Sequence, residues 1–237
     1  MSKNDDYKPP KCTIGDAAHA VVRAGLGAIP VASSAATELF NAIVTPPLEK
    51  RRNKWMQDVG EALKKLDEQK GFNLEELKNN DTFIDIVMHA SQVALRNSQQ
   101  EKLQALRNAV INSALPNTLE ESVQQMFVNF IDTLTVWHIK LLDLVSDPEA
   151  WAKRHHHTFP SLMVGGFSTI LESAFPELKG RQSFYDQLGK DLAYQGLANI
   201  ESFHVTTTGR TLTQKRTTEL GDRFMKLISD PFVTEGN

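Results

Sequence analysis

Residues 202–213, which read SFHVTTTGRTLT, decide the fold that the sequence predicts for its C-terminal part. Apolar and polar residues alternate at the start of this stretch, so Phe203 and Val205 would share one face of an extended segment. The many β-branched residues favour a pleated surface. Gly209 can take a positive φ and supplies a turn, after which residues 211–213 have β character again. The stretch therefore predicts a short β-hairpin.

Helices are predicted on both sides of this hairpin. Upstream, apolar residues recur at helical spacing from Phe184 to Leu192, and Gly196 marks the end of that helix. Downstream, Thr217 or Thr218 caps a second helix, whose apolar face consists of Leu220, Phe224, Leu227 and Ile228. The order helix, hairpin, helix recurs in winged-helix modules, so we expect a winged-helix-like C-terminal region.

The rest of the chain has helical periodicity. Thr45-Pro46-Pro47 is expected to break the chain, and helices are expected from Leu48 to Leu197 with short interruptions. The predicted fold class is therefore mainly α: a multi-helix bundle with a C-terminal winged-helix-like region that contains a small β-hairpin. We divide the chain into a flexible tail over 1–14, a helical domain over 15–117 and a winged-helix-like domain over 118–237.

Composition and charge are those of an ordinary globular protein. The 237 residues are 41% hydrophobic and 23% charged, which is enough to bury a sizeable core. A net charge of −3 gives no overall attraction to nucleic acid or acidic membranes, so such binding would need a local basic patch. Cys12 is the single cysteine, which excludes an internal disulfide. The first ten residues lack the pattern of a signal peptide, so we expect a cytoplasmic protein.

The N-terminal part offers one candidate contact surface. The Ala/Gly-rich segment 17–44 contains an uncharged stretch, 24–37, that is shorter than the about 20 residues needed to span a bilayer. A basic cluster follows, made of Lys50, Arg51, Arg52 and Lys54. At the start of a helix these charges would oppose the macrodipole, which mildly favours a use for them. The alternatives are ordinary packing, a peripheral membrane contact, or a contact between subunits of a homo-oligomer.

No catalytic or metal-binding motif stands out. The adjacent residues of the run His155-His156-His157 cannot all face one ion, so we expect an exposed loop without metal. His138, with Asp143 or Asp147 as its carboxylate, is the best candidate for a catalytic centre. Helix geometry explains both acids, however, and a boundary position explains the histidine. No phosphate-binding glycine motif is present either, so we expect a protein that is not an enzyme and has no cofactor.

A second basic cluster surrounds the predicted hairpin and consists of Lys190, Arg210, Lys215 and Arg216. A winged helix inserts one helix into the major groove and lays its wing on the DNA backbone. Asp186 and Asp191 on the same predicted helix weaken that interpretation. Winged helices also contact proteins, and a fold alone does not decide between the two. We therefore expect a binding protein whose partner is a protein or nucleic acid.

Several short segments resemble the bacterial abortive-infection alpha family, which is found near phage-defence genes. They are the N-terminal Gly/Ala segment, Thr45-Pro46-Pro47-Leu48 followed by a basic helix, LLDLVSDP at 141–148, and the end of the chain from Gly196-Leu197 to LGDRF at 220–224. The resemblance spans most of the chain. It implies a role in phage defence, and it carries over no catalytic residues.

Overall fold

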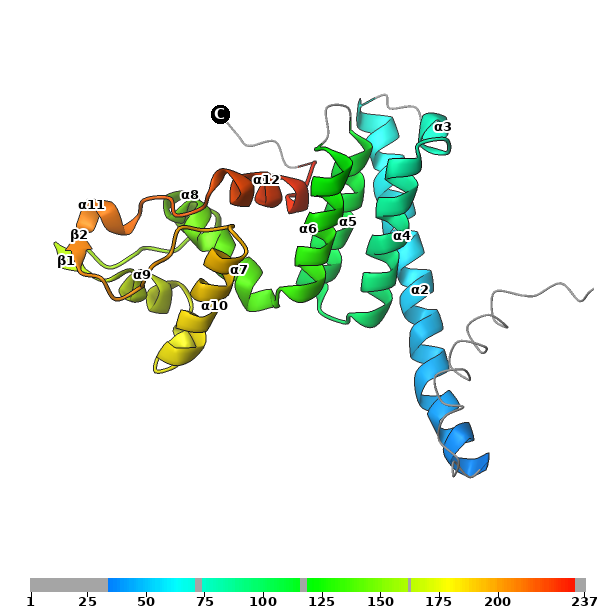
Figure 1. Cartoon of the computed structure of the whole chain (residues 1–237), viewed down its shortest axis with the longest axis horizontal. Coiled ribbons are helices and arrows are strands. Elements are labelled where there is room, and N and C mark those ends of the chain that lie inside the picture. Colours follow the sequence, from blue (N-terminus) through cyan, green and yellow to red (C-terminus); the bar gives the residue numbers. More distant parts are fainter. Residues whose placement is uncertain (1–33, 71–73, 116–118, 162, 233–237) are drawn as a thin grey trace, which may run out of the picture. The chain divides into compact units, whose positions relative to one another are not determined.

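The computed structural model describes the backbone of residues 34–70, 74–115, 119–161 and 163–232 (Figure 1). The predicted tail and most of the Ala/Gly-rich segment lie outside these residues. The chain divides into two compact units, Met1–Lys50 and Arg51–Asn237. The predicted domain boundary at residues 117 and 118 falls within the second unit and stays a prediction.

Helix α2, Ser34–Lys70, runs through the residues where a break was predicted. That prediction is wrong, because the backbone stays helical at Pro46 and Pro47. Proline fixes φ near the value of an α-helix, so this angle is compatible with the helix, although each proline also removes one backbone donor. The basic cluster therefore lies inside a helix, and the argument from the macrodipole does not apply to it.

The first part of the second unit is built from helices that pack side by side (Figure 1). After the short α3, Leu74–Leu77, they are α4, Asp81–Arg96, α5, Gln100–Ala114, and α6, Glu121–Thr133. The helical periodicity expected from Leu48 to Leu197 is confirmed in α4, where Phe83, Ile86, Ala90, Val93 and Ala94 are buried. Trp55 of α2 donates from Nε1 to Ser91 Oγ of α4 at 2.8 Å, which ties these two helices together.

The remaining elements follow from residue 136 onward. They are α7, Val136–Ser146; α8, Pro148–Arg154; β1, Val164–Gly165; α9, Phe167–Ala174; the 3-10 turn η1, Pro176–Leu178; α10, Gln182–Tyr194; β2, Thr207–Thr208; α11, Gly209–Leu212; and α12, Glu219–Ile228. Helix α10 packs on α7, and α12 contacts both α5 and α7. No helix in the part of the chain that the structure describes is long and apolar enough to cross a membrane.

The predicted hairpin within residues 202–213 does not form. Strand β2 instead pairs antiparallel with β1, with Thr208 opposite Val164 and Thr207 opposite Gly165. The predicted turn at Gly209 is the start of α11, and the predicted second strand at 211–213 is the end of that helix and its C-cap. The alternation predicted that Phe203 and Val205 share one face of a strand. In the structure Phe203 is fully buried, whereas Val205 is 61% exposed. The part of the chain that the structure describes is mainly helical with one small antiparallel sheet, and the winged-helix topology is not confirmed.

Phe203 explains why this segment departs from a hairpin. Its ring packs on α10 at Gly189, where an added Cβ would lie 2.6 Å from the ring. The ring also meets Phe167 and Tyr185 at centroid distances of 5.7 and 5.9 Å. Burying a phenylalanine stabilises a fold by about 1.5–3 kcal/mol. Packing against helices thus outweighs the weak local preference for a hairpin.

Candidate binding site around Arg216

The frame of the candidate site begins at the end of α10, which the sequence predicts correctly. Gly196 has φ +70°, a conformation that favours glycine. Its N–H donates to Ala193 O at 3.0 Å, and Leu197 N–H donates to Leu192 O at 2.9 Å. This pair of bonds is a Schellman motif, which satisfies the last carbonyls of the helix and turns the chain sharply.

The chain after this turn runs beside the segment that leads into α12. Asn199 N–H donates to Arg216 O at 2.7 Å, and Thr218 N–H donates to Leu197 O at 3.1 Å. Thr218 also caps α12 by accepting from Gly221 N–H at 3.0 Å, as predicted. The backbone of Arg216 therefore has a fixed place between α10 and α12.

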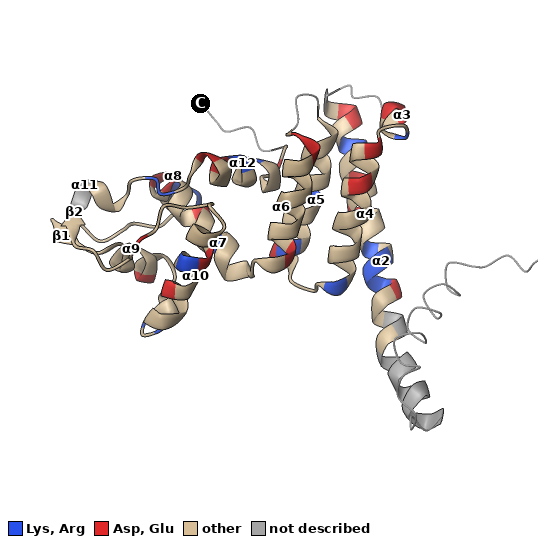
Figure 2. Ribbon diagram, in the orientation of Figure 1, with Lys and Arg blue, Asp and Glu red and all other residues tan. Residues whose placement is uncertain are grey.

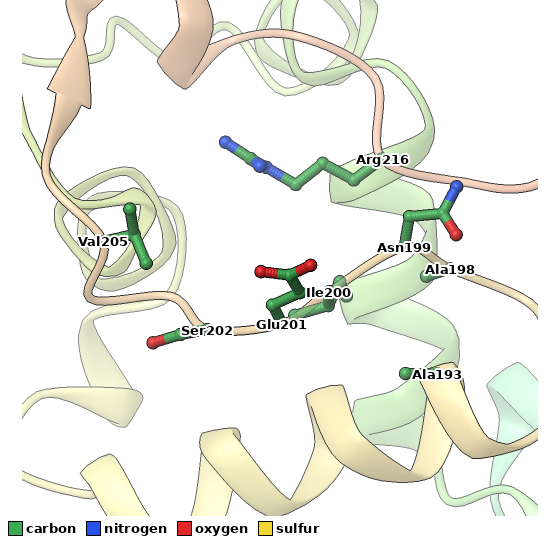
Figure 3. Close-up of a pocket in the computed structure, with 8 residues that line it drawn as sticks. All are labelled: Ala193, Ala198, Asn199, Ile200, Glu201, Ser202, Val205 and Arg216. Atoms are coloured by element: carbon green, nitrogen blue, oxygen red, sulfur yellow. The ribbon is translucent and has the colours of Figure 1, made fainter.

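These segments border an open cavity of about 460 Å³ (Figure 3). Its volume is in the range of small-ligand sites, which runs from about 300 to 1,000 Å³. Both polar and apolar side chains line it: Ala193, Ala198, Asn199, Ile200, Glu201, Ser202, Val205 and Arg216. Such a mixture suits a ligand with one charged group on a partly apolar body.

The guanidinium of Arg216 is the dominant charge in the cavity. It lies 4.6 Å from the centroid of the Phe167 ring, and Nη2 donates to Thr211 O at 3.2 Å. Nε is buried and has no hydrogen-bond partner. Burial lowers the pKa of Arg216. Among the described residues, no carboxylate lies within ion-pair distance of this guanidinium, so a half-buried cation is left without a close counter-charge.

Glu201 lies across the cavity from Arg216. In Figure 3 its carboxylate points toward the arginine side chain from the opposite side. Glu201 is exposed, whereas Arg216 is half-buried. Water therefore screens the Glu201 charge much more than that of Arg216. The loop that carries Glu201 is anchored three residues later, where His204 Nε2 lies 2.9 Å from Asp186 Oδ1.

The structure describes the side chains of three of the four basic residues predicted near the hairpin, and these three differ in their surroundings. Lys190 is exposed on α10, and the side chain of Arg210 lies outside the described residues. Lys215 is paired with Asp222, and Arg216 reaches into the cavity. Figure 2 shows acidic and basic residues intermixed on α8 and α10 rather than a continuous basic face.

The N-terminal basic cluster is more accessible. Lys50, Arg51 and Lys54 are exposed and Arg52 is half-buried. Arg51 Nη1 donates to Leu95 O at 3.4 Å, a long bond to the end of α4. These positions allow an ordinary solvated helix face as readily as a contact surface.

His138 has a carboxylate partner, but not one of those considered from the sequence. Its Nε2 lies 3.1 Å from Asp191 Oδ2 of α10, and its Nδ1 accepts from Thr135 N–H at 3.0 Å. Asp143 instead accepts from Arg154, and Asp147 caps α8. His138 thus helps to cap α7 and joins it to α10, and it does not line the cavity around Arg216.

The three histidines at 155–157 make separate local contacts. The ring of His155 stacks on Trp151 at 4.1 Å, and His157 Nε2 lies 2.9 Å from Ser173 Oγ. His156 takes the positive φ of 48° that ends this turn. The described residues contain no group of three or more side chains placed to hold a metal ion.

Sequence reasoning missed most of the cavity. Arg216 was a candidate as part of a surface patch, but Asn199, Glu201, Ser202 and the supporting Phe167 were not. The one available signal was Gly196, because polar residues that directly follow a sharp helix end often line a turn. No family model, curated protein or solved structure matches this chain.

Proposed function

We propose that this chain is a non-enzymatic binding protein that holds a partner protein against the Arg216 cavity. Large apolar side chains that are exposed in this part of the chain carry this proposal. Val205 lines the cavity and is 61% exposed. Tyr194 is 94% exposed and follows Ala193, a lining residue, in the sequence. Met163, 91% exposed, precedes β1. Tyrosine, methionine and arginine are enriched in the centres of protein–protein interfaces.

A protein partner is favoured over nucleic acid by the state of the basic residues. Binding to a phosphate backbone depends on several free lysines and arginines that together displace counterions. Here Lys215 has Asp222 as its partner, and Arg216 points inward. A recessed arginine beside apolar groups suits a partner that presents one acidic group within an apolar surface.

The proposal that the protein is not an enzyme rests on the candidate catalytic groups. His138, Asp143 and Asp147 each contact a helix end or an ion-pair partner that accounts for its position. A role in phage defence rests on the resemblance to the abortive-infection alpha family. It would be tested by plaque counts on cells that carry or lack the gene.

The partner can be sought by affinity capture from the source cells and then tested as a purified pair. Val205→Asp places a charge at the cavity, and we expect it to weaken the purified complex at least about tenfold, or 1.4 kcal/mol. Met88→Asp is the matched control, because Met88 is 57% exposed but lies on α4. Equal binding by both variants would reject the proposal, as would a retarded DNA band at low salt in place of any protein complex.

A further inference from the structure

We propose that the Arg216 cavity is an oxyanion site that binds a carboxylate or phosphate group. The proposal rests on the proposed function only for the source of that group, which the partner protein would supply as an acidic side chain, a chain terminus or a phosphorylated residue. The cavity can be probed with small anions alone, so its own test does not need the partner.

The first argument is the incomplete bonding of the guanidinium. Arginine offers five N–H donors in a rigid fork, and one Nη2–H is directed at Thr211 O. Nε–H is buried and makes no hydrogen bond within the described residues. A buried, unused donor on a half-buried cation is unfavourable, because that donor has lost water without gaining a partner. An oxyanion in the cavity would supply the missing counter-charge.

The second argument is that the guanidinium is held in place before any ligand binds. Its face rests on the Phe167 ring, which is itself 2% exposed. The backbone of Arg216 is fixed by Val145 O, which accepts its N–H at 2.8 Å, and by Asn199 N–H, which donates to its carbonyl. A planar fork that is already fixed loses less conformational entropy on binding.

The negative charge of Glu201 should oppose anion binding in the cavity. Its carboxylate points toward the space where an oxyanion would lie (Figure 3). Since like charges repel, this acid should weaken anion binding, and its exposure should keep the effect modest. Glu201→Gln removes the charge with little change in shape, so it should tighten anion binding rather than abolish it.

Arg107 supplies a control within the same molecule. Its Nε is also buried without a hydrogen-bond partner. Its cavity, of about 270 Å³, is lined by three acids, Asp58, Glu61 and Asp230, and Asp230 Oδ2 lies 3.9 Å from Nη2 of Arg107. Internal carboxylates already surround this arginine, so an added anion should not bind there.

The test follows the Nε–H resonances of the arginines by ¹⁵N–¹H NMR in the full-length protein. Sodium acetate and sodium phosphate are titrated separately to about 100 mM, with sodium chloride at matched ionic strength as the reference. We expect the Arg216 signal, assigned by its loss in Arg216→Gln, to shift saturably with at least one anion while the Arg107 signal does not. Glu201→Gln should lower the apparent Kd by about two- to fivefold.

The two anions distinguish the source of the group. A larger response to acetate indicates a carboxylate, and a larger response to phosphate indicates a phosphorylated ligand; either supports the site. An Arg216 signal that neither anion moves in the natural sequence or in Glu201→Gln overturns the proposal, as does a parallel shift of Arg107. If no anion binds at Arg216 but Val205→Asp still weakens the complex with the partner protein, the proposed function stands without the oxyanion site. If an anion binds but Val205→Asp leaves the complex unchanged, the oxyanion site stands and the proposed function is rejected.

Discussion

The Arg107 and Arg216 cavities contain the same chemical group in two different surroundings. Each arginine has a buried Nε without a hydrogen bond. Three carboxylates line the cavity of Arg107, whereas Arg216 meets an aromatic ring, one carbonyl and one exposed acid across the cavity. The neighbouring charges, rather than the depth of burial, separate an arginine that stabilises the fold from one that is free to bind a ligand.

The region around Arg107 shows how polar groups are used for structure. Two asparagines of α5 hold the end of α12: Asn108 Nδ2 donates to Ile228 O at 2.8 Å, and Asn112 Nδ2 donates to Leu227 O at 2.7 Å. The last carbonyls of a helix have no partners within it, so these side chains complete the helix. Arg216 Nε–H, in contrast, donates to no carbonyl or carboxylate of the described residues. Substitutions in the two regions can therefore be compared directly.

The largest effect is expected where the frame of the Arg216 cavity is tightest. At Gly221 an added Cβ would lie 2.0 Å from Leu197 O, a backbone atom that cannot move alone. Gly221→Ala should therefore lower the free energy of unfolding by about 3 kcal/mol, measured by urea denaturation. It should also abolish anion binding, because the segment that carries Arg216 would shift.

Gly60→Ala is the matched control for this substitution. Gly60 is exposed within α2, and an added Cβ there would meet nothing within 4 Å. Alanine is the better helix former, so this variant should gain up to about 1 kcal/mol. A Gly221→Ala protein as stable as the natural one would show that the contact with Leu197 does not constrain the cavity.

The next effect tests the structural half of the comparison. Asn108 is 3% exposed, and Asn108→Ala would leave Ile228 O without its donor. We expect a loss of about 2 kcal/mol in the free energy of unfolding, with anion binding at Arg216 unchanged. Asn53→Ala, at an exposed position of α2, should change stability by less than about 0.5 kcal/mol. Equal losses in the two variants would contradict this assignment.

The sequence predicted what depends on near neighbours. The buried stripe of α4, the end of α10 at Gly196 and the cap of α12 at Thr218 all follow from signals within a few residues. A helical period or a cap can be recognised locally because the atoms involved lie within one or two turns. These local signals also located α10 and α12, the two helices on either side of the Arg216 cavity.

The sequence did not predict what depends on distant partners. Strand β2 pairs with β1, more than forty residues earlier, rather than with its own neighbour, and His138 meets Asp191 instead of Asp143 or Asp147. The inward direction of Arg216 depends on Phe167 and Thr211, which no local pattern connects with it. Residue type alone therefore suggested a basic surface where the fold makes a cavity.

The next, smaller effect concerns Asp222, which is the ion-pair partner of Lys215. The adjacent Arg216 has no such partner among the described residues. Burial raises the pKa of Asp222, but hydrogen bonds from Lys215 and Thr217 and the charge of Lys215 outweigh it, so the pKa is lowered. A lowered pKa contributes stability above the unfolded value of about 4, and this stability is lost as the pH falls through the folded value. Asp222→Asn should thus be less stable at pH 7.

The pH dependence supplies the measurement for this variant. The thermal midpoints of Asp222→Asn and the natural protein should converge as the pH falls below about 4. Asp67→Asn, which removes one exposed acid from α2, is the control for the loss of a negative charge. A difference that persists undiminished at pH 3 would mean that Asp222 stabilises the fold through contacts other than those of its charge.

The smallest effect compares the two arginines directly. Arg107→Gln leaves Lys65 as the basic residue among the three acids that line this cavity, and we expect it to lower the free energy of unfolding by about 1 kcal/mol, since the cluster is partly exposed. Arg216→Gln loses the bond to Thr211 O and the contact with Phe167, but it also removes an uncompensated buried charge. These terms oppose each other, so its stability should change by less than about 0.5 kcal/mol. Urea denaturation in a buffer without carboxylate or phosphate makes the comparison. If Arg216→Gln proves the more destabilised of the two, the guanidinium stabilises the fold and is not primarily an anion-binding group.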